Sequence, residues 1–202
     1  MHKTTRLVSF VFALLLASPA AVLAAPDKPE AEYKVGDRLP TKQDTAKSSY
    51  KEITWDDLIP PDWDPMRDFK KLNLGKLRDG DPRAMEILER LRREWDNAPV
   101  NPSLNGARIR LPGFVVPLES SRDAVREFLL VPYFGACIHT PAPPANNTIH
   151  VFPAKAVKGI HAMDAVWVSG ELTVQHSHTE WGAAGYRIKA ENIVSYKINK
   201  KR

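Results

Sequence analysis

The chain has 202 residues, of which 29 are Lys or Arg and 24 are Asp or Glu, so its formal net charge is +5. This length fits one ordinary domain, and a single cysteine excludes an internal disulfide, a four-cysteine zinc module and an iron–sulfur cluster held by this chain alone. Charged residues at 26% and apolar residues at 43% are ordinary for a globular protein and exclude a chain that is disordered throughout.

Residues 1–24 have the pattern of a secretory signal peptide. Lys3 and Arg6 precede an apolar run at 7–16, and small residues follow up to Ala24. The run is shorter than the roughly 20 strongly apolar residues that a membrane helix needs. We therefore expect cleavage near Ala24 and an exported, periplasmic protein that does not span the membrane. Loss of the two basic residues leaves a positive excess too small to argue for a nucleic-acid partner.

Residues 25–49 are rich in Pro, Lys, Asp, Glu and Thr and poor in large apolar side chains. Such a segment buries too little surface to offset its ordering entropy, so we expect a flexible leader. A single globular domain is expected to follow over residues 50–198, with a basic tail at 199–202. Near its start, Trp55 and Leu58 are expected to pack on the edge of the domain.

A helix is expected near residues 82–97. Asp81 can cap its N-terminus, and Pro82 suits the first turn, where a missing N–H costs nothing. Apolar residues recur at steps of three and four and form one stripe: Ala84, Ile87, Leu88, Leu91 and Trp95. We interpret this segment as one packed helix whose stripe covers the core and whose charged face meets solvent.

From about residue 105 the pattern changes to strands. A bent first strand starts at Ala107, and further strands are expected at 127–133, 148–152, 165–174 and 185–198. The predicted fold class is mainly β, with α+β character on the N-terminal side. Its core is a small five- to six-stranded barrel like the oligonucleotide/oligosaccharide-binding (OB) barrel. This fold does not fix a function.

Two pairs of side chains could carry chemistry. Cys137 precedes His139 by two residues, just before a proline-rich loop, and His176 and His178 have the same spacing. Residues i and i+2 of an extended backbone lie on one face, so each pair can reach one point. A thiolate and three imidazoles are the ligand set of a tetrahedral zinc site, and the same donors suit copper. We therefore predict a zinc-like site at Cys137, His139, His176 and His178, with His150 and His161 as further candidates.

Two other interpretations stay open. Cys137 can act as a catalytic nucleophile if a nearby histidine activates its thiol. A lone cysteine is also often a small buried apolar residue, and the prolines at 141–144 can then serve a domain that only docks a partner.

Three segments resemble an uncharacterised family of exported bacterial proteins, domain of unknown function 3299. They are ITWDDL at 53–58, LPGFVVPLE at 111–119 and FLLVPYFGACIHTPAPPAN at 128–146, and with residues 166–172 they span about 50–198. The family's prolines run unbroken before an asparagine, whereas Ala142 and Ala145 interrupt them here. The resemblance supplies no catalytic residue.

The resemblance implies an exported protein without an established activity, whose genes often lie near those for ABC-type transporters and metal handling. We therefore expect a periplasmic metal-binding protein, or a transporter accessory in envelope metal homeostasis, and the balance favours a protein that is not an enzyme. A cysteine-dependent envelope enzyme using Cys137 and a non-catalytic OB-like interaction module are the alternatives.

Overall fold

The structure is a computed structural model that describes residues 33–41, 49–64, 67, 81–121 and 124–197. The predicted signal peptide and the predicted basic tail lie outside these residues. No helix in the described ranges is both long and apolar enough to cross a bilayer.

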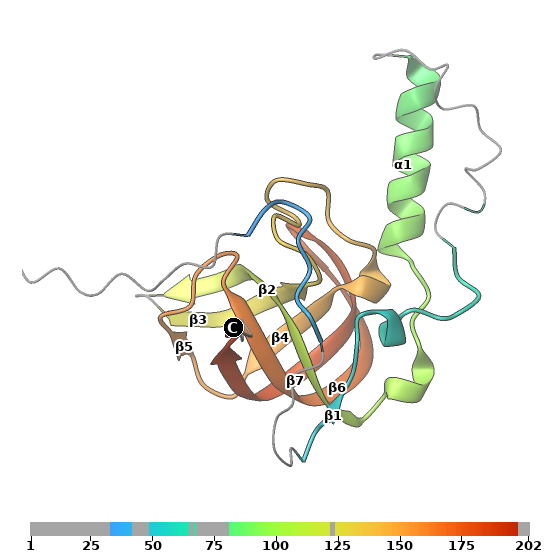
Figure 1. Ribbon diagram of the computed structural model, residues 1–202. Coiled ribbons are helices and arrows are strands. Elements are labelled where there is room, and N and C mark those ends of the chain that lie inside the picture. The colour runs from blue at the N-terminus through green and yellow to red at the C-terminus, as the bar shows by residue number, and fades with distance from the viewer. Residues whose placement is uncertain (1–32, 42–48, 65–66, 68–80, 122–123, 198–202) are drawn as a thin grey trace, which may run out of the picture. The chain divides into compact units, whose positions relative to one another are not determined.

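Among the described residues, seven strands form one sheet in the order β1-β2-β6-β7-β4-β3-β5, and a further pairing of β2 with β3 closes five of them into a ring (Figure 1). Neighbouring strands are antiparallel except for β1–β2 and β4–β7, which are parallel. The strands are β1 (Lys51–Glu52), β2 (Ala107–Ser121), β3 (Ala124–Val131), β4 (Ile149–Pro153), β5 (Val157–Lys158), β6 (Ala165–Thr179) and β7 (Gly182–Ser195). The ring of β2, β3, β4, β7 and β6 confirms the prediction of a mainly β protein with an OB-like core.

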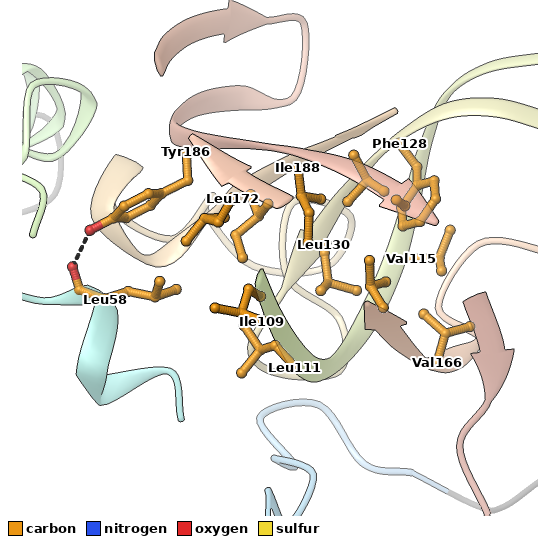
Figure 2. Packing of buried hydrophobic residues seen from close by; sticks show 14 of the residues in the cluster. Leu58, Ile109, Leu111, Val115, Phe128, Leu130, Val166, Leu172, Tyr186 and Ile188 are labelled. Carbon is orange, nitrogen blue, oxygen red and sulfur yellow. Dashed lines mark hydrogen bonds between the residues drawn. The ribbon is translucent and has the colours of Figure 1, made fainter. Parts of the chain in front are cut away.

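Side chains that alternate along the ring strands fill its interior. Figure 2 shows this core, to which β2, β3, β6 and β7 all contribute. Leu58, from the 3-10 helix η1 (Asp56–Leu58), and Trp55 are buried against it, as predicted. Gly113 permits this close packing, because a Cβ there would lie 2.7 Å from the Leu130 side chain.

A second apolar cluster lies on the outward side of β2 and β3. Tyr33 packs edge-on against Phe114, with ring centroids 5.1 Å apart, and Leu39 is buried. Arg38 forms a β-bridge with Tyr133. Residues 33–40 therefore contact the ring, although the sequence places them in a flexible leader. The reason is that this face of the ring is itself apolar. Even a segment with few apolar side chains removes apolar surface from water when it covers this face.

Helix α1 (Pro82–Asp96) forms where the sequence predicts it, with the Asp81 carboxylate accepting a hydrogen bond from the Arg83 amide. The predicted stripe is partly packed: Ala84, Ile87, Leu91 and Trp95 are half-buried, no residue of the helix is fully buried, and Met85 and Leu88 are 57% and 58% exposed. The strands of the ring fill its interior themselves, and residues 33–40 already cover part of its apolar outer face, so little apolar surface is left for the helix to cover. Two further short helices within the described ranges are η3 (Pro102–Leu104) and η4 (Ala145–Asn147).

Candidate functional site

The predicted pair of Cys137 and His139 lies in a turn after β3 rather than in a strand. Cys137 has a left-handed backbone with φ of 65°, and the His139 amide donates to the Gly135 carbonyl at 2.8 Å. The extended backbone that would place both side chains on one face is therefore absent. The sequence could not show this, because Gly135 and the left-handed Cys137 fold the chain back on itself locally.

The Cys137 thiol is half-buried and packs beside the outward apolar cluster. Burial raises the pKa of the Cys137 thiol to about 11. A thiol with that pKa is protonated at neutral pH when no metal is bound, whereas nucleophilic attack needs the thiolate. This environment favours the structural interpretation of Cys137.

His176 and His178 lie on β6, which continues to Thr179 instead of ending at residue 174 as predicted. Both side chains are exposed, and their ring centroids are 5.0 Å apart. Across the described ranges, no three His, Cys, Asp or Glu side chains are grouped so that they could hold a metal ion. The structure thus brings His176 and His178 together but does not bring the four predicted ligands to one point.

A different group of polar side chains does converge. His150 on β4 is only 7% exposed, and its two ring nitrogens contact side chains from two other strands. Nε2 lies 2.6 Å from Oε1 of Glu127 on β3, and Nδ1 lies 3.0 Å from Oγ of Ser177 on β6. We call these three residues, with Phe152 and Arg187, the His150 cluster.

The strand order explains why the His150 cluster forms. Ile149 and Val151 belong to the interior core, so His150 between them faces outward. β4 lies between β3 and β7, and His150 is paired in register with Arg187 on β7. On β6, a register shift between residues 174 and 177 inserts an extra residue just before Ser177. Such bulges change the direction in which a side chain points.

His150 is neutral at neutral pH. Burial lowers its pKa, and the nearby positive charge of Arg187 lowers it further, although the Glu127 carboxylate acts in the opposite direction. The carboxylate of Glu127 can only accept, so the Nε2–H of the neutral ring donates to it. Nδ1 then has a free lone pair, and the Ser177 hydroxyl donates its hydrogen bond to that nitrogen.

Arg187 completes the His150 cluster with a guanidinium that lies over the Phe152 ring. Its Cζ lies 3.7 Å from the centre of the Phe152 ring, and the Phe152 ring centre is in turn 4.4 Å from that of His150. The Nε atom of Arg187 is buried without a hydrogen-bond partner, and within the described residues the guanidinium forms no ion pair. A guanidinium in this condition is suited to bind a carboxylate or a phosphate, whose two oxygens match its donors.

Sequence reasoning named His150 only as an isolated candidate and missed the other members. Glu127 and Ser177 are 23 and 27 residues away from His150 along the chain, and no motif spacing connects them. The one available signal was a polar residue between apolar neighbours in a short strand. His161, the other isolated candidate, is exposed beside Asp164, with Nδ1 3.7 Å from Oδ2.

Fold and site together define a mainly β protein in which an OB-like ring carries a polar cluster on its outward face. The chain belongs to the DUF3299 family, whose model, described as a protein of unknown function, matches residues 55–195. A solved DUF3299 family protein from Pseudomonas aeruginosa PAO1 is 35% identical, with a TM-score of 0.57 over 74% of this chain and 98% of that chain.

A small single-stranded DNA-binding protein from Streptomyces coelicolor is 20% identical over 46% of this chain and 95% of that one, with a TM-score of 0.29. This TM-score is too low to support any inference about the fold or the function of this chain. No curated protein matches the chain.

Proposed function

We propose that this chain is a ligand-binding module that holds an anionic group at the His150 cluster. The observation that carries the proposal is Arg187, whose buried Nε has no partner and whose guanidinium stacks on Phe152. The half-buried guanidinium has no hydrogen bond at its terminal nitrogens among the described residues, and a carboxylate or phosphate that reaches those nitrogens gains charge-assisted hydrogen bonds. The stacking holds the guanidinium plane in one orientation, so little freedom is lost when an anion binds.

The place of the cluster in the fold supports the same proposal. OB folds bind their ligands on the face of their second and third ring strands and with the loop between the fourth and fifth. The corresponding strands here are β3 and β4, which carry Glu127, His150 and Phe152, and Ser177 lies near the end of β6, in the β6–β7 hairpin. This support is an analogy at the level of the fold. Export to the periplasm, metal binding and a transporter partner remain predictions.

Titration of the labelled protein with inorganic phosphate and, separately, with acetate tests the proposal by amide NMR at constant ionic strength. We expect saturable changes in the amide chemical shifts around Arg187, Phe152 and His150. The anion that binds more tightly shows whether carboxylate or phosphate oxygens fit the guanidinium better. Arg187→Gln should weaken binding about 10-fold or more, because a hydrogen bond to a charged group contributes roughly 1.5–3 kcal/mol.

Arg108→Gln is the matched control. Its guanidinium is already paired with the Glu191 carboxylate at 2.8 and 3.0 Å, so its charge is compensated and a second anion gains less there. Binding that does not saturate, or that weakens equally in both arginine variants, would contradict the proposal.

A further inference from the structure

We infer that Ser177 is a nucleophile activated by His150 and oriented through Glu127, so that this face of the ring hydrolyses small carboxylic esters. The inference goes beyond anion binding, because it needs the Ser177 hydroxyl and not the Arg187 guanidinium. It rests on two hydrogen bonds that connect a carboxylate, an imidazole and a hydroxyl in series.

The two distances satisfy the geometric requirement for general-base activation. A base has to lie within about 2.6–3.2 Å of the hydroxyl whose proton it takes, and a third group has to orient the base. His150 lies 3.0 Å from the Ser177 hydroxyl, and Glu127 holds the opposite ring nitrogen at 2.6 Å. Compared with the serine-protease triad the two ring nitrogens exchange partners, but the roles are the same, and such triads are recognised by role and geometry.

The surroundings keep the His150 imidazole neutral, which is the protonation state that a general base requires. The charged groups that face it are Glu127 from β3 and Arg187 from β7, while β6 contributes the uncharged Ser177. His150 is nearly inaccessible to solvent, whereas Ser177 is only half-buried and lies near the end of β6. All three residues lie on strands of one sheet, which hold side chains more rigidly than loops do.

The chemistry balances with water as the second reactant. His150 Nδ1 takes the hydroxyl proton as Ser177 Oγ forms a bond to the ester carbonyl carbon. The bond between that carbon and the alkoxy oxygen then breaks, and the proton on Nδ1 passes to the leaving alcohol. Water attacks the acyl-serine with the same base, its proton returns to Ser177 Oγ, and the carboxylic acid leaves.

A fluorophosphonate probe tests the inference on the full chain after treatment with EDTA. We expect one phosphonyl adduct per chain, with loss of HF, and tandem mass spectrometry should place it on Ser177. p-Nitrophenyl acetate should be hydrolysed by the same preparation. Both signals should be lost in Ser177→Ala and kept in Ser195→Ala, which replaces an exposed serine on β7.

Glu127 acts through His150 and is a positioning residue, so its test is the pH profile. The wild-type labelling rate should rise as His150 loses its proton and then level off. Glu127→Gln should slow labelling by about 10-fold or more and move the midpoint to lower pH, because the carboxylate raises the pKa of His150. A purely structural network would change stability without moving this midpoint.

The wild-type protein alone can overturn the inference, whatever the variants do to folding. No adduct, an adduct on another residue, or a labelling rate without a pH midpoint would each refute it. Labelling without phosphate or acetate binding would support this inference and refute the proposed function, and anion binding without labelling would do the reverse.

Discussion

Replacing Tyr186 by phenylalanine tests how the ring is joined to the segments that precede it. The Tyr186 side chain is fully buried, and its hydroxyl donates to the Leu58 carbonyl at 2.6 Å (Figure 2). The same hydroxyl accepts a hydrogen bond from the Asn101 amide, also at 2.6 Å. One oxygen therefore connects β7 with η1 and with the residue that precedes η3.

The magnitude follows from what the substitution leaves behind. Phenylalanine keeps the ring and opens no large cavity, so the loss is confined to two hydrogen bonds. A buried backbone group left without its partner costs about 1–3 kcal/mol. Because the Asn101 amide is only partly buried and can regain water, we expect Tyr186→Phe to lower the free energy of unfolding by about 2–4 kcal/mol. For a domain of this size that corresponds to a fall in Tm of roughly 5–12 °C.

Urea unfolding followed by tryptophan fluorescence measures this change, with the m-value as a check that the unfolded state is the same. Tyr50→Phe is the matched control, because its hydroxyl donates to Glu191 on the surface and its loss should leave stability near the wild-type value. A Tyr186→Phe protein within about 0.5 kcal/mol of wild type, a typical surface-substitution effect, would show that the two 2.6 Å contacts do not stabilise the fold.

Three further outcomes are expected. Burial holds the pKa of His150 below its ordinary value of 6.5, so the unfolded chain binds a proton at a higher pH than the folded chain does. The free energy of unfolding should therefore decrease as pH falls from 6.5 through the lowered pKa. In urea titrations, His150→Gln should reduce this pH dependence. With a pKa of about 11, Cys137 should react with iodoacetamide at pH 7 roughly 100-fold more slowly in the folded than in the urea-unfolded chain, and fast labelling near pH 6 would contradict this. If the purified protein carries a zinc-like ion, replacing both His176 and His178 by alanine should remove the ion and Cys137→Ser should not, as measured by elemental analysis. Equal loss of the ion in both variants would support the four-ligand site predicted from the sequence.

The sequence by itself determined the local elements, because their signals are local. Alternating apolar residues at 107–115 and 165–174 lie in strands, and Asp81 with Pro82 starts a helix, since strand pleating and helix capping depend on near neighbours. The family resemblance also came from contiguous segments, and the family match over residues 55–195 confirms it.

Only the tertiary structure decided which polar side chains meet. The antiparallel pairing of β4 with β3 and its parallel pairing with β7 bring Glu127, His150 and Arg187 onto adjacent strands, and a bulge in β6 precedes the contact with Ser177. Register between distant strands depends on how the whole interior packs, because a slip of one residue would turn every side chain to the other face. The same dependence explains Cys137: its spacing from His139 suggested a shared face, and a left-handed turn packed against the outside of the ring removed the extended backbone on which that suggestion relied.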